Sequence, residues 1–173
     1  MATRTGGSPA PPAAHRELSP ADGLAQLSFL IQGILERLAR VHGLSVIQIR
    51  LLGVLRDRQP TMNELARLLS LDKSSVTGLV DRAERRGLVA RVASTADRRS
   101  VLVSLTDQGR SIMSAGAARF GADISLLLGR LPPSDRDALS RLISRLLVAR
   151  ATDHGIDLFA TLKAEDPRDG SPA

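Results

Sequence analysis

Apolar residues near the start of the chain recur at the spacing of one helix face. Between residues 24 and 41 they are separated by alternating steps of three and four residues, the pattern of a long amphipathic helix that packs along a partner. The six positions are Leu24, Leu27, Ile31, Ile34, Leu38 and Val41. Ser19 followed by Pro20, with a carboxylate at Asp22, is a capping pattern that predicts the beginning of this helix, and Gly43 marks its end.

The last third of the chain predicts two more long helices. Apolar residues keep helical spacing from Ile112 to Leu131, and the pair Pro132 and Pro133 then ends one helix and begins another. The second of these helices carries apolar residues at Leu139, Leu142, Ile143, Leu146 and Leu147. Both ends of the chain are therefore expected to be helical.

The terminal helices need cover for their apolar faces, because burying one such side chain contributes about 1.5 to 3 kcal/mol. Leaving the six positions of the first helix in water would forfeit on the order of 10 kcal/mol, as much as the stability of many whole domains. The helices can pack as a bundle within one chain or across a two-fold axis. We favour a homodimer, because three long helices cannot easily cover one another and also hold a separate middle module. The expected dimer contacts are Leu24, Leu27, Ile31, Ile34, Leu139, Leu142, Ile143 and Leu146.

Between residues 45 and 105 the predicted elements become short and the turn signals frequent. Ser45 caps one helix, which closes before Pro60. Thr61 and Glu64 then form a capping box that opens a second, shorter helix. These elements predict a compact module between the long terminal helices.

A third helix follows after a tight link, capped by Asp72 and stopped at Arg86 by Gly87, which completes the plan of a helix-turn-helix. Its expected core positions are Val76, Leu79, Val80 and Ala83. Its first turn displays Lys73, Ser74, Ser75 and Thr77, small polar groups of the kind that contact base edges in the major groove. Serine and threonine also occur in first turns simply as caps or solvent-facing residues, so this helix alone leaves both interpretations open.

Two β-favouring runs follow, at residues 88–92 and 100–105, with a polar tip between them. The tip carries Asp97, Arg98 and Arg99, and a charged hairpin beside a helix-turn-helix is typical of a wing. From Asp72 to Arg99 the chain has seven positive and four negative residues, so this stretch carries +3 of the net charge of +6. We expect the winged module to be the part that grips phosphate.

Composition argues against several other kinds of chemistry. The chain has no cysteine, which excludes disulfides, thiolate metal sites and a cysteine nucleophile and favours the reducing cytoplasm. Its three histidines lie far apart, and no nucleophile has an evident base partner, so we expect no metal, no cofactor and no enzymatic activity. The longest uncharged apolar stretch, residues 23–35, is shorter than the ~18 to 20 residues that cross a bilayer, and no membrane partner is expected.

These motifs resemble those of the MarR family (multiple antibiotic resistance regulators) of winged helix-turn-helix transcription factors. The most specific signal is the wing signature D-x-R-x5-L-T, present as Asp97, Arg99, Leu105 and Thr106. The recognition-helix sequence from Leu71 onward also matches, and the resemblance covers about residues 24–150. One departure is Gly78, where the family often carries arginine.

The resemblance implies an obligate homodimer that binds double-stranded DNA at a pseudo-palindromic operator, most often as a repressor released by a small amphipathic or aromatic effector. The expected DNA contacts are Lys73, Ser74, Ser75, Thr77, Gly78, Arg82, Arg85, Arg98 and Arg99, with Asp97 stabilising the wing. Candidate effector-pocket residues are His42 and Arg50, each of which is equally consistent with an ordinary surface position.

The expected fold is mainly α with a small β-hairpin wing: a winged helix-turn-helix module plus a helical dimerisation domain. The expected segments are a flexible N-terminal arm (1–18), a dimerisation helix (19–44), the winged module (45–105), dimerisation helices (106–150) and a partly disordered C-terminal extension (151–173). An alternative function is an adaptor whose winged module binds protein instead of DNA. The adaptor would show no salt-sensitive binding to duplex and no use for Arg98 or Arg99.

Overall fold

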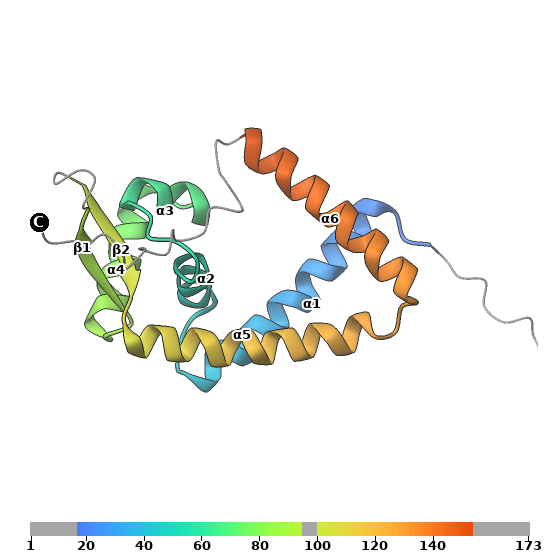
Figure 1. Cartoon of the computed structure of the whole chain (residues 1–173), viewed down its shortest axis with the longest axis horizontal. Helices are drawn as coiled ribbons and strands as arrows, with labels where there is room; N and C mark the ends of the chain where they lie inside the picture. Colours follow the sequence, from blue (N-terminus) through green and yellow to red (C-terminus); the bar gives the residue numbers. More distant parts are fainter. Residues whose placement is uncertain (1–16, 95–99, 154–173) are drawn as a thin grey trace, which may run out of the picture.

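The structure, a computed structural model, describes residues 17–94 and 100–153. Within these ranges the chain forms six helices and one antiparallel pair of strands (Figure 1). Their order is α1 (Pro20–Val41), α2 (Val46–Leu55), α3 (Met62–Leu69), α4 (Lys73–Arg85), β1 (Val89–Ala93), β2 (Val101–Leu105), α5 (Asp107–Leu128) and α6 (Pro133–Asp153). This confirms the expected fold class, mainly helical with a small hairpin.

Local capping determines where most of these helices begin. The N-cap residues are Ser19, Ser45, Thr61, Asp72 and Thr106, and each side chain accepts a hydrogen bond from a backbone N–H of its first turn. Ser45 with Gln48 and Thr61 with Glu64 form complete capping boxes. At the end of α4, Gly87 has φ +67°, a left-handed conformation that glycine adopts without steric cost.

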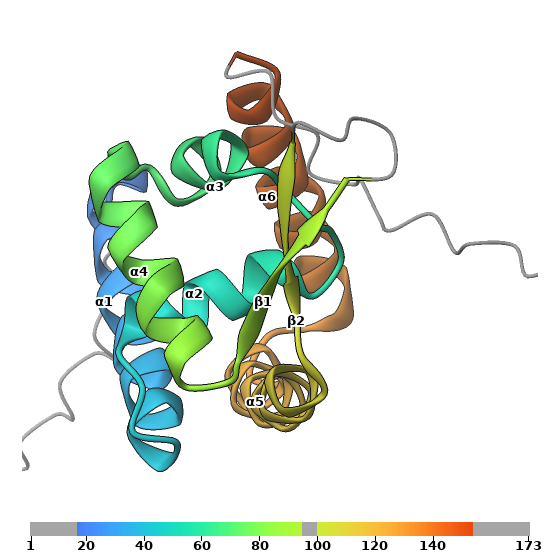
Figure 2. The ribbon, with the colours of Figure 1, turned by 90° about the vertical axis from the view of Figure 1, so that its left-hand side faces the viewer.

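The hydrophobic core lies inside the module formed by α2, α3, α4 and the hairpin (Figure 2). All four expected core residues of α4 are buried. The largest fully buried side chains are Leu51, Leu52, Leu65, Leu79, Leu88, Val76, Val80, Val89 and Val103. In β2 the alternation holds for Val103 and Leu105, whereas Val101, at the strand end farthest from α5, is 45% exposed.

Backbone pairing attaches the middle of β2 to the segment that leads into α3. The N–H of Val103 donates to the carbonyl of Pro60 at 2.9 Å, and Leu102 forms an isolated antiparallel bridge with Thr61. On its other edge β2 pairs with β1 from Val89 opposite Leu105 to Ala93 opposite Val101. β2 is therefore held along both of its edges.

A close backbone approach fixes where the long helix α5 leaves the module. A Cβ at Gly109 would lie 2.0 Å from the carbonyl oxygen of Leu88, so only glycine permits this packing. The hydroxyl of Thr106 donates to the carbonyl of Gly87 at 2.5 Å and also caps α5. The helix that leads out of the winged module is thus anchored beside the end of α4.

The terminal helices leave much apolar surface uncovered in the single chain. α6 turns back from the end of α5, and it lies well apart from α1 (Figures 1 and 2). Leu24 is 58% exposed on α1, and Leu142 and Leu146 on α6 are 56% and 61% exposed. Of the other expected dimer contacts, Ile34 is buried within its own chain at 5% exposure, Ile31 and Leu139 are half-buried, and Leu27 and Ile143 are exposed.

Across residues 17–94 and 100–153, no single helix is both long and apolar enough to cross a membrane. Only α1 and α2 taken together meet the length and composition test, and a 90° bend separates them. The α2 half of that pair lies in the core of the module, with Leu51 and Leu52 fully buried.

Candidate nucleic-acid interface

Helix α4 turns one face to the core and the other to solvent. Lys73, Ser74, Ser75 and Thr77 in its first turns are exposed, as are Arg82 and Arg85 farther along, and Gly78 is half-buried. Within the described ranges, the side chains of Lys73, Arg82 and Arg85 have no hydrogen-bond or ion-pair partner. The outer face of α4 therefore presents cations that no carboxylate of the described ranges engages.

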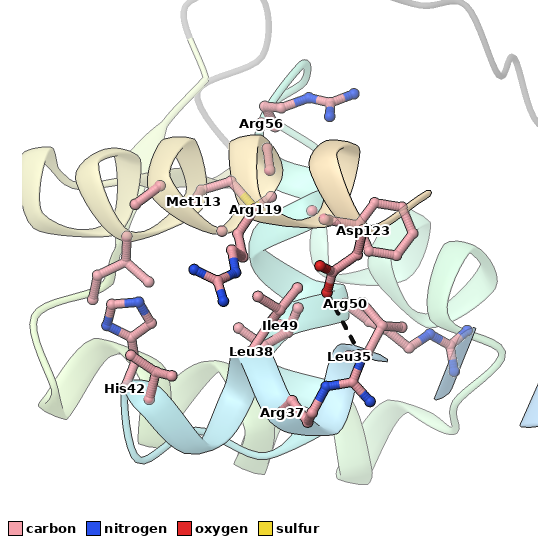
Figure 3. A pocket seen from close by; sticks show the side chains of 17 residues that line it. Leu35, Arg37, Leu38, His42, Ile49, Arg50, Arg56, Met113, Arg119 and Asp123 are labelled. Atoms are coloured by element: carbon pink, nitrogen blue, oxygen red, sulfur yellow. Dashed lines mark ion pairs between the residues drawn. The ribbon is translucent and has the colours of Figure 1, made fainter. Parts of the chain in front are cut away.

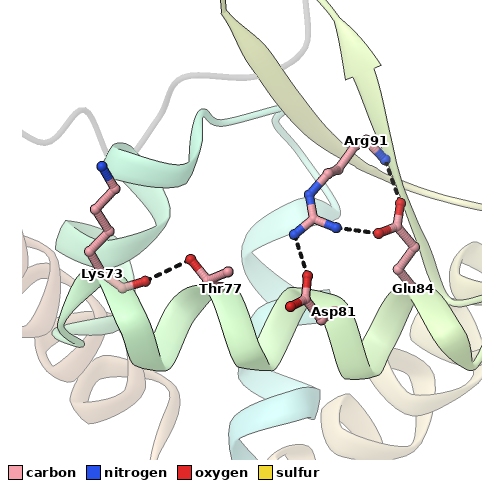
Figure 4. Close-up of polar contacts among 5 residues, drawn as sticks. All are labelled: Lys73, Thr77, Asp81, Glu84 and Arg91. Atoms are coloured by element: carbon pink, nitrogen blue, oxygen red, sulfur yellow. Dashed lines mark hydrogen bonds and ion pairs between the residues drawn. The ribbon is translucent and has the colours of Figure 1, made fainter.

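The first turn of α4 is organised around the carboxylate of Asp72. It accepts hydrogen bonds from the Ser74 hydroxyl at 2.6 Å, the Ser75 hydroxyl at 2.6 Å and the Ser75 backbone N–H at 2.8 Å. These hydrogen bonds, with that from Ser74 the largest cause, hold the pKa of Asp72 well below its usual range. The Thr77 hydroxyl donates to the carbonyl of Lys73 at 2.9 Å (Figure 4).

The two other carboxylates of α4 are neutralised by a single arginine of the wing. Arg91, on β1, binds Asp81 at 2.6 Å and also donates to Glu84 (Figure 4). The hydrogen bond with Asp81 raises the pKa of Arg91 above its ordinary value. The sequence interpretation counted Arg91 only as one more positive charge; the signal for its role is that Asp81 and Glu84 lie three residues apart, on one helix face.

A second arginine, also not singled out from sequence, connects the end of α4 to the end of α1. The guanidinium of Arg86 donates to the carbonyls of Gly43 at 2.6 Å and His42 at 2.9 Å. A cation at these carbonyls complements the negative end of the α1 dipole. The two partners are more than forty residues apart in the chain, so no local spacing reveals the contact.

The wing residues expected from sequence, Asp97, Arg98 and Arg99, lie outside the described residues. Their roles stay predictions.

A cavity of about 670 Å3 opens between α1, α2 and α5 (Figure 3). Both residues named from sequence, His42 and Arg50, line it. Its apolar wall includes Leu35, Leu38, Val41, Ile49, Ile112, Met113 and Phe120. The size falls within the roughly 300 to 1,000 Å3 typical of small-molecule pockets.

The cavity also contains charged groups that sequence reasoning missed. Arg37 of α1 forms a 3.7 Å ion pair with Asp123 of α5, at the end opposite His42 (Figure 3). Arg119 of α5 points between the helices toward α1, and it has no polar partner in the part of the chain that the structure describes (Figure 3). A guanidinium beside an apolar wall is suited to an anionic group on an otherwise apolar molecule.

Over residues 17–94 and 100–153, no group of three or more His, Cys, Asp or Glu side chains could hold a metal ion. Asp72 and Glu64 serve as helix-capping partners, and Asp81, Glu84 and Asp123 are paired with arginines.

A helix-turn-helix whose second helix exposes small polar and basic residues, followed by a two-stranded hairpin, defines a winged helix-turn-helix DNA-binding protein. The model of the MarR family matches residues 42–100. The transcriptional repressor NicR of Pseudomonas putida is 27% identical over 145 residues, covering 79% of this chain and 92% of NicR. The transcriptional activatory protein BadR of Rhodopseudomonas palustris is 35% identical over 92 residues, 53% of this chain and 43% of BadR. The chain is therefore similar to the MarR family of DNA-binding transcriptional regulators, whose model it matches over the winged module.

Solved structures share the fold across most of the chain. Apo MarR of E. coli superposes with a TM-score of 0.63 at 24% identity, covering 76% of this chain and 99% of that one. NadR, solved in complex with 4-hydroxyphenylacetate, superposes with a TM-score of 0.64 at 21% identity, covering 78% and 96% of the two chains.

Proposed function

We propose that this regulator acts in the cytoplasm as a homodimer that represses transcription at a pseudo-palindromic operator and is released by a small amphipathic effector. In this proposal α4 enters the major groove. The wing, with Arg98 and Arg99, reaches the adjacent minor groove, where a narrow groove attracts guanidinium groups.

One observation carries the DNA-binding part of the proposal: the charge on α4 is sorted. Its carboxylates Asp81 and Glu84 are neutralised by Arg91, while its cations Lys73, Arg82 and Arg85 are exposed and unpaired within the described residues. A surface that keeps its positive charges free and its negative charges paired is complementary to phosphate.

The apolar surface of the terminal helices supports the dimer. Leu142 and Leu146 of α6 are more than half exposed, and Leu24 of α1 is exposed to the same degree. Covering such side chains contributes about 1.5 to 3 kcal/mol each when burial is complete. A second copy, placed across a two-fold axis, supplies the matching apolar surface and places two winged modules on successive grooves.

The cavity between α1, α2 and α5 supports the effector. It joins a dimerisation helix to the winged module, so a molecule bound there contacts both parts. Its apolar wall and Arg119, which has no polar partner within residues 17–94 and 100–153, fit an amphipathic anion. NadR binds 4-hydroxyphenylacetate, an aromatic carboxylate, which makes this compound a suitable first probe.

The salt dependence of binding to duplex DNA tests the central claim. If three or four cations per subunit reach phosphates, log affinity falls against log salt concentration with a slope of about −5 to −7. Lys73→Met or Arg99→Ala is expected to make that slope shallower by roughly one per subunit, while helix content stays unchanged. A slope near zero, or no binding at low ionic strength, contradicts DNA recognition and favours the adaptor.

The mass of the chain in solution tests the dimer separately. Sedimentation equilibrium is expected to give twice the mass of one chain. Replacing Leu142 and Leu146 together by glutamate places charges on the exposed apolar face of α6 and is expected to yield monomers. A wild-type monomer at micromolar concentration contradicts the proposed assembly.

A further inference from the structure

The three hydroxyl groups at the start of α4 are already engaged as hydrogen-bond donors. The hydroxyls of Ser74 and Ser75 donate to the carboxylate of Asp72, and that of Thr77 donates to the carbonyl of Lys73. Ionised carboxylates and carbonyls are acceptors only, so each hydroxyl proton must lie along its intrahelical bond. Each hydroxyl oxygen therefore offers the solvent lone pairs but no free proton.

This polarity restricts what the hydroxyls can bind on DNA. In the major groove, guanine offers acceptors at N7 and O6, thymine one at O4 and adenine one at N7. The donors there are the amino groups at adenine N6 and cytosine N4. Phosphate oxygens, like the ring and carbonyl acceptors, cannot donate, so a hydroxyl without a free proton pairs with the amino groups alone.

We propose that Ser74, Ser75 and Thr77 recognise exocyclic amino groups of adenine or cytosine as hydrogen-bond acceptors. Asp72 is the positioning residue, because it holds the protons of both serines. The inference rests on the proposed function, in which α4 lies in the major groove, and it assigns the base preference of that helix. Phosphate binding is then left to Lys73, Arg82 and Arg85, the cations of α4 that have no partner among the residues the structure describes.

The alternative, in which the serines turn to donate to phosphate, is electrostatically unfavourable. Rotating a serine hydroxyl away from Asp72 removes a hydrogen bond from an ionised carboxylate, which then faces the phosphate with the same sign of charge. The lowered pKa of Asp72 means that protonation does not relieve this repulsion at neutral pH. Both effects favour keeping the hydroxyls as acceptors.

Duplexes that lack single amino groups test the proposal. A preferred site is first selected from a pool of random duplexes, and its half-sites are then resynthesised with purine in place of each adenine or 2-pyrimidinone in place of each cytosine. At one to three positions per half-site, loss of the amino group is expected to weaken wild-type binding about three- to tenfold. In each of the variants Ser74→Ala, Ser75→Ala and Thr77→Val, one position is expected to become insensitive: removing the amino group that the substituted residue contacts no longer weakens binding.

Matched variants separate this effect from a general weakening of the helix. Ser28→Ala removes a hydroxyl of α1 that also donates to a backbone carbonyl, that of Ala25 at 2.8 Å, and is expected to leave the pattern unchanged. Asp72→Asn exchanges one acceptor oxygen for an NH2 donor, which frees a serine proton. Random-duplex selection with that variant is expected to shift a contacted position toward guanine or thymine, a change of preference that a structural defect alone does not produce.

Two results overturn the inference. In the first, the affinity of the wild-type protein does not change when any amino group is removed. Instead, 7-deazaguanine or a neutral methylphosphonate weakens binding of the wild type but not of the serine or threonine variants. The other is wild-type preference in all three hydroxyl variants. Either result leaves the proposed function intact, because sequence-specific, salt-sensitive binding to DNA persists. If the protein shows no salt-sensitive binding to duplex DNA, both this inference and the proposed function are refuted.

Discussion

The guanidinium of Arg86 donates a hydrogen bond of 2.9 Å to the carbonyl oxygen of His42. Because His42 lines the cavity, this bond connects the end of α4 to the cavity wall. Arg86 follows α4 directly as its C-cap, and His42 is the C-cap of α1. The same guanidinium also binds the carbonyl of Gly43. The Arg86 side chain therefore links the end of α1 directly to the end of α4.

Arg86→Met tests this connection. The variant loses two charge-assisted hydrogen bonds at the end of α1, and we expect the free energy of unfolding to fall by about 1 kcal/mol. Arg85→Met is the matched control: it removes the same charge from the neighbouring position, which has no partner in the described residues, and a change within about 0.5 kcal/mol is expected. Urea unfolding measures both. Equal destabilisation of the two variants would show that the contact contributes nothing.

Arg91→Met should weaken DNA binding without Arg91 itself touching DNA. It leaves Asp81 and Glu84 uncompensated on α4, and we expect affinity at low salt to fall on the order of tenfold. Adding Asp81→Asn and Glu84→Gln removes the unpaired charges and is expected to restore most of the affinity. Fluorescence anisotropy with a labelled duplex measures the three proteins. A triple variant as weak as the single one contradicts this account.

Arg119→Met tests the anionic character of the cavity. With 4-hydroxyphenylacetate as probe, loss of the Arg119 guanidinium is expected to raise the dissociation constant about five- to tenfold. Arg130→Met, an exposed arginine that follows α5 outside the cavity, serves as the control and is expected to bind like wild type. Titration calorimetry measures the constants. If both variants retain wild-type affinity, Arg119 does not bind the carboxylate.

Gly109→Ala should be among the most destabilising single changes in α5. Its Cβ meets the backbone carbonyl of Leu88 at 2.0 Å, so helix and hairpin must separate, at a cost of about 3 kcal/mol. Gly121→Ala in the same helix has nothing within 4 Å and is expected to stabilise the chain by about 0.5 to 1 kcal/mol through helix propensity. Thermal unfolding at equal protein concentration compares them, and a shift of the same sign in both contradicts the close approach.

The acid dependence of the α4 cap follows from the hydroxyls that bind Asp72. The pKa of this carboxyl is lower in the folded chain than in the unfolded one, so its contribution to stability is complete above its ordinary pKa and is lost as pH falls through the lowered folded value. In Ser74→Ala or Ser75→Ala the pKa should rise toward the ordinary value. Side-chain carboxyl NMR titration measures it, and an unchanged pKa in both variants contradicts the hydrogen bonds.

The features predicted from sequence are those that depend on residues close together in the chain. The caps at Ser45, Thr61 and Asp72 depend on side chains within one helical turn, and the buried face of α4 follows from its apolar spacing. The structure bears out both, together with the helical and hairpin fold class.

Features that depend on how elements cross were not predicted. Arg37 meets Asp123, and Arg119 enters the cavity, only because α1 and α5 pass each other at one particular place and angle. Arg91 and Arg86 likewise find partners on other elements. Placing His42 and Arg50 near a pocket relied on the family resemblance, and helix periodicity alone carries no information about such distant neighbours.

The attachment of β2 to the segment before α3 makes that segment an edge of the sheet as well as the entrance to a helix. Because Val103 bonds Pro60 and Leu102 pairs with Thr61, residues that lead into the helix-turn-helix also hold the hairpin in place. A substitution at Pro60 or Thr61 therefore disturbs two neighbouring elements at once.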